Sequence, residues 1–182
     1  MLPAFEGLSI IPFDTLTRHY PPSEHDAFVA ITYARNNLAR RERYLLLKQM
    51  GYRMASFVSP SAEVSENTLI GDNCFILENT CLQPFTTIGN NVFIWCGSSV
   101  CHHSRIGDHS FLASGVTVSG NVTVGECCFL GAHATLRDGL QIGDQSVIGA
   151  GALLLNDVPA DSLVIGSASL PSDWPASRLY SI

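Results

Sequence analysis

Charged side chains are scarce in this sequence of 182 residues. They make up 14% of it, against about 25% in an average soluble domain. Lys and Arg number 10 and Asp and Glu 16, which gives a net charge of -6. A net negative chain lacks the basic surface that attracts nucleic acid or anionic membranes, so we expect neither as a partner. With 46% hydrophobic residues the chain is too apolar for disorder, and either its surface is largely uncharged or part of it is buried in an oligomer.

Long apolar runs are also missing. No stretch approaches the roughly 18 residues that a membrane-spanning helix needs, so membrane insertion is not expected. The first ten residues, MLPAFEGLSI, contain no basic residue and include Glu6, which argues against a secretory signal. We therefore expect a cytoplasmic protein.

Motifs for metals, disulfides and phosphate loops are lacking as well. The six cysteines, Cys74, Cys81, Cys96, Cys101, Cys127 and Cys128, show no CxxC spacing. In a reducing cytoplasm they are expected to be buried thiols, and no metal site is predicted. Neither GxGxxG nor GxxxxGK[ST] occurs, which excludes the usual nucleotide phosphate loops.

What the sequence does contain is a repeat of six residues. Steps of six meet only Ile, Leu or Val at 17 consecutive positions: Val58, Val64, Ile70, Ile76, Leu82, Ile88, Ile94, Val100, Ile106, Leu112, Val118, Val124, Leu130, Leu136, Ile142, Ile148 and Leu154. Glycine follows at every third step, at Gly71, Gly89, Gly107, Gly125 and Gly143, 18 residues apart. A corner glycine is expected there because glycine tolerates positive φ. The pattern predicts an all-β solenoid, a parallel β-helix in which residue i lies over residue i+18.

The repeat also divides the chain. Residues 58–159 form the predicted β-helix, residues 1–57 a small α/β segment, and residues 160–182 a C-terminal tail. Within the first segment, a strand near 27–32, a helix over 36–50 and a strand at 55–58 form a β-α-β unit. Leu45, Leu46, Leu47 and Met50 are its expected packed face, and Arg35, Arg40, Arg41 and Arg43 its expected solvated face or, alternatively, an attractor of anions.

The residues with the clearest chemistry are two adjacent histidines, His102 and His103. The 18-residue rule places Pro84, His102, Gly120 and Asp138 in one column of the solenoid. An imidazole that takes a proton, beside a backbone N–H that stabilises an oxyanion, suits acyl transfer. A second column, Ser114, Ala132 and Ala150, is small at each level and would leave a groove for a thin pantetheine arm.

At these residues the sequence resembles a known family. The stretch SSVCHHSRIGDHSFLASGVTVSGNVTVGECCFLGA is similar to the left-handed β-helix acyltransferases of the sialic-acid O-acetyltransferase and bacillosamine N-acetyltransferase type. The likeness extends down to FVAITYARNNLARRERYLLLKQMGYRMASFVSPSAEV, which makes residues 1–57 a partial nucleotide-sugar-type domain, and up to NDVPADSLVIG.

The resemblance implies a left-handed helix, a homotrimer, acetyl-CoA as donor and an amino sugar, nucleotide-linked in the family, as small-molecule acceptor. It assigns His102 as general base and the Gly120 N–H as the donor to the acetyl carbonyl. Phe111, Ala132 and Ala150 fall where the family lines its CoA channel, and Ser114 belongs to the same small column. The family usually carries an acidic residue beside the base, whereas here the neighbours are Cys101 and His103, so His103 joins the predicted catalytic pair.

The function expected from the sequence is therefore direct N-acetylation of an amino sugar by an acyltransferase. Three alternatives remain open: O-acetylation of a sugar, a non-catalytic scaffold, and a γ-carbonic-anhydrase-like enzyme with zinc on His102, His103 and His109. Cys101 as a covalent nucleophile is a further variant of the transferase.

Overall fold

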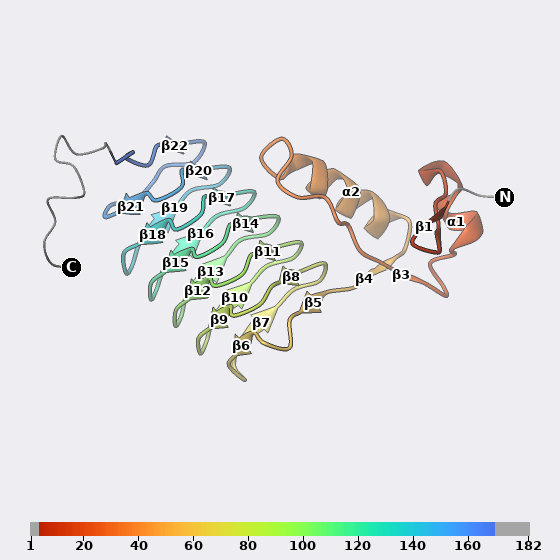
Figure 1. Ribbon diagram of the computed structural model, residues 1–182, viewed down its shortest axis with the longest axis horizontal. Coiled ribbons are helices and arrows are strands. Elements are labelled where there is room, and N and C mark those ends of the chain that lie inside the picture. Colours follow the sequence, from red (N-terminus) through yellow and green to blue (C-terminus); the bar gives the residue numbers. More distant parts are fainter. Residues whose placement is uncertain (1–3, 170–182) are drawn as a thin grey trace, which may run out of the picture.

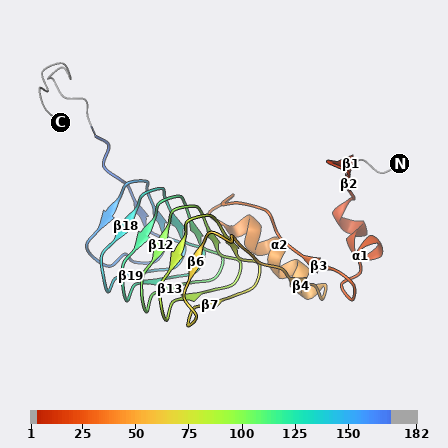
Figure 2. The same cartoon turned by 60° about the horizontal axis from the view of Figure 1, so that its bottom comes forward.

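The computed structural model describes residues 4–169 and consists of a β-helix with a small α/β unit beside it (Figure 1). The strands of the helix are two residues long and form three parallel sheets, which we call faces A, B and C. Turning the molecule shows the coils stacked along one axis, with the α/β unit to one side (Figure 2). The predicted left-handed β-helix is confirmed.

The strands of each face follow one another at intervals of one coil. Face A holds β5 (Phe57–Val58), β8 (Phe75–Ile76), β11 (Phe93–Ile94), β14 (Phe111–Leu112), β17 (Phe129–Leu130), β20 (Val147–Ile148) and β22 (Leu163–Val164). Face B holds β6 (Glu63–Val64), β9 (Cys81–Leu82), β12 (Ser99–Val100), β15 (Thr117–Val118), β18 (Thr135–Leu136) and β21 (Leu153–Leu154). Face C holds β7 (Leu69–Ile70), β10 (Thr87–Ile88), β13 (Arg105–Ile106), β16 (Thr123–Val124) and β19 (Gln141–Ile142). The turns between faces are named corners AB, BC and CA, in chain order.

The second residue of every strand from β5 to β21 is the Ile, Leu or Val that the six-residue repeat selects. These side chains point inward, and Ile94, Val100 and Ile106 are fully buried on three different faces. The parallel pairing of Val100 with Val118 keeps the predicted step of 18 residues. Because a buried Val, Leu or Ile side chain contributes about 1.5–3 kcal/mol, the repeated core stabilises every coil.

The corner glycines are present for a reason other than the expected one. Gly71, Gly89, Gly107, Gly125 and Gly143 are absent from the residues with positive φ. Space is what requires them, because a Cβ on Gly89 would lie 2.8 Å from the backbone nitrogen of Asp108 in the next coil. The left-handed conformation falls two residues later in the same corner, at residues such as Asn73 (φ 52) and Asn91 (φ 56).

The last coil is shorter than the others and reaches past residue 159. Val158 bridges to Ile142, a step of 16 residues (158 − 142), so two residues are missing from this coil. β22 then pairs with β20 inside the segment that the sequence assigned to the tail. The remainder of that tail, from residue 170 on, lies outside the described residues.

The α/β unit begins with a hairpin of β1 (Ala4–Phe5) and β2 (Leu8–Ser9), then η1 (Phe13–Thr15) and α1 (Leu16–His19). The β-α-β unit follows as β3 (Asp26–Ala27), α2 (Leu38–Gln49) and β4 (Arg53–Met54), with β3 parallel to β4. The two strands are shorter than predicted, and β4 and β5 are separate. Within residues 4–169 no helix is long and apolar enough to cross a membrane.

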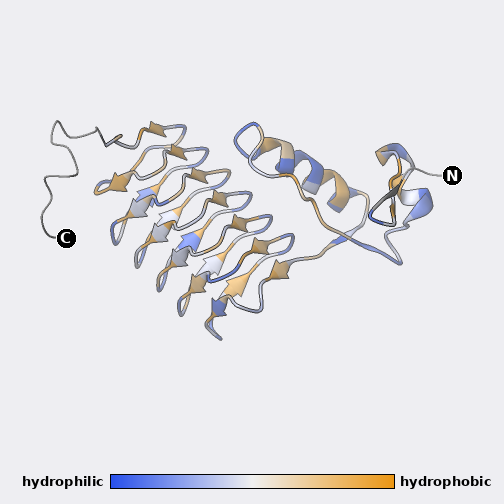
Figure 3. Ribbon diagram, viewed as in Figure 1, coloured by the Kyte–Doolittle hydropathy of each residue, from blue (hydrophilic) through white to orange (hydrophobic). Residues whose placement is uncertain are grey.

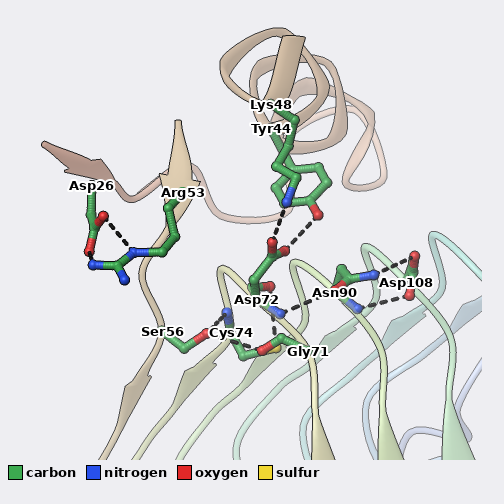
Figure 4. Close-up of polar contacts among 10 residues, drawn as sticks. All are labelled: Asp26, Tyr44, Lys48, Arg53, Ser56, Gly71, Asp72, Cys74, Asn90 and Asp108. Carbon is green, nitrogen blue, oxygen red and sulfur yellow. Dashed lines mark hydrogen bonds and ion pairs between the residues drawn. The ribbon is translucent and has the colours of Figure 1, made fainter. Parts of the chain in front are cut away.

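The buried face of α2 differs from the prediction. Leu47 is buried, but Leu45 is 43% exposed, and Arg40 and Tyr44 are buried in its place. The reason is the surface beneath the helix, which is partly polar: the Tyr44 hydroxyl donates to Asp72 Oδ1 at 2.6 Å and Lys48 Nζ to Asp72 Oδ2 at 2.7 Å (Figure 4). Asp72 is also held by the next coil, since its N–H donates to Asn90 Oδ1 at 3.1 Å.

A ladder of aromatic side chains covers the outside of face A, whose strands are coloured as hydrophobic in Figure 3. Phe75, Phe93, Phe111 and Phe129 stack on successive coils. The segment before α2 lies over them: Phe28 stacks on Phe93 with ring centres 5.8 Å apart, and Tyr33 meets Phe111 at 5.1 Å. The α/β unit is therefore docked on its own β-helix through apolar contacts.

Arg40 corrects the expectation of a solvated basic face. It is fully buried over the Phe93 ring, 4.4 Å from the ring centre. Its guanidinium donates to the carbonyl oxygens of Thr32 (2.6 Å), His109 (2.8 Å) and Ser110 (3.1 Å) and to Asn91 Oδ1 (3.1 Å). These partners are neutral, and burial lowers the pKa of Arg40 to about 10. The charge is held by oriented dipoles of corner CA, which the sequence alone does not display.

His109 lies in the same buried network and makes the docking sensitive to acid. Asn91 Nδ2 donates to His109 Nδ1 at 2.9 Å, an arrangement that requires the neutral ring. Burial lowers the pKa of His109 from 6.5 to about 4, with Arg41 and Arg40 acting in the same direction. The unfolded chain therefore binds more protons than the folded one between these values, and stability falls as pH drops from about 6.5 to about 4.

We expect the free energy of unfolding to fall by about 2–3 kcal/mol over this pH range because of His109. In His109→Asn, which suits the left-handed backbone (φ 64), that part of the pH dependence should disappear. Urea unfolding at a series of pH values measures it. His133→Asn, at an exposed histidine that is also left-handed (φ 57), is the matched control; equal slopes in the two variants would contradict the assignment.

Candidate functional site

The paired histidines lie at corner BC, one residue beyond the end of β12. His102 N–H donates to Gln83 Oε1 at 3.0 Å, and His103 N–H donates to the Pro84 carbonyl of the coil below at 3.2 Å. His103 takes the left-handed position of the corner (φ 58) and stacks on Phe85, with ring centres 5.0 Å apart. Both side chains are exposed, so the stacked coils hold a solvent-facing imidazole pair in place.

The structure brings His102 and Gly120 together as the column predicts. A Cβ on Gly120 would lie 2.5 Å from His102 Cε1 and 2.7 Å from His102 Nε2. Only glycine leaves room for the ring there, because real Cβ atoms do not approach other atoms so closely. The imidazole edge with Nε2 is therefore packed against the backbone of the next coil.

The Gly120 N–H is not free in this structure. It donates to Asp138 Oδ1, one coil further on, at 2.7 Å. The sequence column contained Asp138 but gave no reason to link it to this N–H, because stacking order does not fix side-chain torsions. An oxyanion could use this donor only after the carboxylate has moved.

The two histidines contact one another through their Nδ1 atoms, which are 3.2 Å apart. One ring must donate and the other accept, so at least one of them is neutral. If His102 donates through Nδ1, its Nε2 carries the lone pair and faces the Gly120 edge. His103 then accepts in the position of the acidic neighbour that resembling enzymes carry, which leaves His102 Nε2 able to take a proton.

The small residues Ser114, Ala132 and Ala150 form their column at corner AB. His133 N–H donates to the Ser114 carbonyl at 3.0 Å and Gly151 N–H to the Ala132 carbonyl at 2.8 Å, which shows that the coils stack in register there. Ala150 is exposed and the other two are half-buried. Corners AB and BC lie on opposite edges of face B, so one chain does not bring this column to His102.

Phe111 does not belong to either column. It lies on the outside of face A and is only 1% exposed, because Tyr33, Trp95 and its neighbours in the aromatic ladder cover it. A buried ring under the α/β unit of its own chain cannot line a channel. The family position that it matches is therefore used here for docking the N-terminal unit.

Other candidate groups are dispersed. His109 lies at corner CA, away from His102 and His103, and residues 4–169 contain no group of three His, Cys, Asp or Glu side chains placed to hold a metal ion. All six cysteines are free, and Cys96 is exposed, whereas a buried thiol was expected. Burial raises the pKa of Cys101, which does not favour the thiolate that covalent catalysis would need.

The close packing of Gly120 against the His102 ring leads to a direct test of the site. We expect Gly120→Ala to lower kcat about a hundredfold, because the new methyl group must push the His102 ring aside. The backbone φ at Gly120 is not positive, so the fold should tolerate alanine. Steady-state kinetics and a thermal melt measure the two effects. His102→Asn combined with Gly120→Ala should be no slower than His102→Asn alone; full activity of Gly120→Ala would show that the close contact is irrelevant.

Comparisons with known protein families identify the hexapeptide repeat of the β-helix. The family of the bacterial transferase hexapeptide (six repeats) matches residues 85–120, and that of the hexapeptide repeat of succinyl-transferase matches residues 121–155. No curated protein matches in sequence.

Solved structures give a fuller match. The enzyme PerB from Caulobacter crescentus, in complex with CoA and GDP-perosamine, superposes with a TM-score of 0.84 at 28% identity, over 90% of this chain and 78% of that one. The acetyltransferase domain of PglB from Neisseria gonorrhoeae shares the fold at 24% identity (TM-score 0.82, 91% of this chain and 80% of that one). So does WeeI from Acinetobacter baumannii at 21% identity (TM-score 0.59, 90% and 78%).

These matches confirm the predicted resemblance to the hexapeptide-repeat sugar acyltransferases, and with it the identification of the chain as an acyltransferase.

Proposed function

We propose that this chain, a hexapeptide-repeat acyltransferase, transfers the acetyl group of acetyl-CoA to the amino group of a nucleotide-linked amino sugar. The observation that carries the proposal is the packing of His102 Nε2 against Gly120, which joins a base to a backbone donor. Support comes from the Caulobacter enzyme, crystallised with CoA and an amino-sugar nucleotide. Two further structures of that enzyme have a single histidine replaced and still hold both ligands.

In the proposed reaction His102 Nε2 accepts a proton from the attacking amine as the C–N bond forms. The Nδ1–H of His102 donates to His103, which fixes the tautomer and stabilises the imidazolium. The thioester oxygen becomes an oxyanion and takes the Gly120 N–H. When the C–S bond breaks, His102 returns its proton to the sulfur of CoA, and no acyl-enzyme is formed.

The donor groove is proposed along Ser114, Ala132 and Ala150. Their side chains are short, so a pantetheine arm could lie against the coil backbones without a clash. The solenoid contributes few permanent cations: between residues 58 and 166 the only Lys or Arg residues are Arg105 and Arg137. The charged end of CoA therefore needs basic groups from outside this part of the chain.

A homotrimer is proposed because the two columns lie on opposite edges of face B. The outward side chains of face B from β9 to β21 are uncharged: Cys81, Ser99, Thr117, Thr135 and Leu153. Such a face suits contact with another copy of the chain, and it would bring corner AB of one copy to corner BC of the next. A trimeric hydrodynamic size is the expected result by light scattering.

A transfer assay tests the proposed function. Purified chain is incubated with acetyl-CoA and a panel of GDP- and UDP-linked amino sugars, and the free CoA thiol and the product mass are followed. We expect one acetyl group on the amine nitrogen and stoichiometric thiol release. The matching hydroxy sugars are the control for O-acetylation, and acetylation of these alone would replace the N-transferase by an O-transferase. Acetylation of none of these acceptors would reject the proposal.

A further inference from the structure

Asp138 lies beside the proposed reaction centre and has no part in the mechanism described so far. Its Oδ1 accepts the Gly120 N–H at 2.7 Å, while His102 Nε2 lies 2.7 Å from the point where a Cβ on Gly120 would be. The base and the carboxylate therefore flank the same glycine from successive coils. Asp138 is exposed, so a ligand from solvent can reach its other oxygen.

No positive side chain neutralises this carboxylate within the described residues. The ion pairs found between residues 4 and 169 join Arg35 to Glu42, Lys48 to Asp72, and Arg53 to Asp26. The adjacent Arg137 makes no ion pair with Asp138. The solenoid around it is acidic, with ten Asp and Glu against two Arg between residues 58 and 166.

An uncompensated carboxylate on the oxyanion donor obstructs the proposed reaction. One N–H cannot serve the carboxylate and the thioester oxygen together, and a negative charge beside a developing oxyanion raises the barrier. Something must therefore draw Asp138 away and neutralise it when the substrates are bound. A sugar amine arrives at neutral pH largely as an ammonium ion, which carries three donors and a positive charge.

We propose that Asp138 binds the ammonium group of the acceptor and thereby releases the Gly120 N–H for the acetyl carbonyl. This inference rests on the proposed N-acetyltransferase function. Once bound to Asp138, the ammonium gives one proton to solvent while another N–H stays on the carboxylate. The resulting amine attacks the thioester carbon, so positive charge returns to the nitrogen as the C–N bond forms. A second proton passes from nitrogen to His102 as the C–N bond forms and then to the CoA sulfur as the C–S bond breaks. The products are the amide, CoA thiol and one proton.

The residue thus becomes a determinant of specificity for amines over hydroxyls. A hydroxyl group carries no charge with which to displace the carboxylate, so it would leave the oxyanion donor occupied. The carboxylate of Asp138 would also couple the binding of acceptor and donor, because the Gly120 N–H becomes free for the acetyl carbonyl only when the amine is bound.

The same contact occurs elsewhere in the solenoid and provides the control. At corner CA, Asp144 Oδ1 accepts the Glu126 N–H at 2.8 Å, again from one coil further on. Asp144 is also exposed, but it lies at a different corner from His102. Asp138→Asn and Asp144→Asn keep an oxygen that can accept the N–H and remove only the charge. A purely structural role predicts equal effects in the two variants.

The test is calorimetric titration of each full-length variant with the amino-sugar nucleotide identified by the transfer assay, and with its N-acetylated product, in the presence of CoA. We expect wild type and Asp144→Asn to bind the amine at least about tenfold tighter than Asp138→Asn does, since the ion pair is lost. The neutral amide product should bind all three proteins alike. Steady-state kinetics of Asp138→Asn should show a raised KM for the amine and an unchanged or lower KM for acetyl-CoA.

Each outcome decides between the two proposals. Suppose that the wild-type protein acetylates the amine and that Asp138→Asn still binds the amine more tightly than the amide product, to the same degree as wild type. This result overturns the role of Asp138 and leaves the proposed transferase function intact. Equal losses in Asp138→Asn and Asp144→Asn have the same meaning. A wild-type protein that acetylates no amine overturns both.

Discussion

Replacing His102 with asparagine should lower kcat by about a thousandfold while leaving acetyl-CoA binding unchanged. General base catalysis by a positioned side chain contributes roughly 10²–10⁴ in rate, and the His102 ring is the group packed against Gly120. The donor groove at corner AB does not include His102, so the affinity for acetyl-CoA should be retained. Thiol release under saturating substrates and calorimetric titration measure the two quantities.

His19→Asn is the control for this experiment, because His19 is an exposed residue in α1. It should keep wild-type kcat. If His102→Asn retained a tenth or more of the wild-type turnover, His102 could not be the general base, and another group near Gly120 would have to be sought.

Arg40→Met should lower the free energy of unfolding by about 3 kcal/mol or more. Methionine keeps much of the apolar stem over the Phe93 ring but leaves the carbonyl oxygens of Thr32, Asn91 and His109 without their donor. The Ser110 carbonyl keeps the Phe93 N–H. Each orphaned buried group costs about 1–3 kcal/mol, part of which water recovers if the site opens. We therefore also expect the α/β unit to undock from the β-helix before the coils unfold.

Urea unfolding, together with limited proteolysis of the segment before α2, measures this effect. Arg43→Met is the matched control, because Arg43 is an exposed residue of the same helix whose guanidinium lies over Phe13, 5.0 Å from the ring centre. Equal stability of the two variants would mean that the buried network contributes nothing, and that the aromatic contacts alone hold the α/β unit.

The β-helix could be predicted in detail because one constraint is repeated in every coil. An inward aliphatic side chain recurs every six residues, so a wrong choice of inward positions would soon meet a polar residue. The burial of residues such as Ile94 and Val118 can therefore be predicted from the repeat alone. The burial of Arg40 could not be predicted in this way. Its sequence neighbours Arg41 and Arg43 make it resemble a surface residue, and only the stacked corners show the carbonyl oxygens that receive it.

For the site, the sequence predicted which residues stack on one another but not which side-chain contacts they make. The 18-residue step placed His102 under Gly120, and the structure shows that contact. The step does not determine torsions or partners, so it left out the bond from the Gly120 N–H to Asp138 and the cover that Tyr33 provides for Phe111. The first depends on the side-chain torsions of Asp138, which the column contains but does not orient, and the second on Tyr33, which lies outside the repeat.

Calorimetric titration of the wild-type protein with acetyl-CoA tests the central claim most directly, because the transferase and each role assigned to His102, Gly120 and Asp138 require the donor. We predict saturable binding of about one acetyl-CoA per chain, with micromolar affinity. Absence of binding up to millimolar acetyl-CoA would contradict the account and leave the β-helix as a scaffold for another purpose.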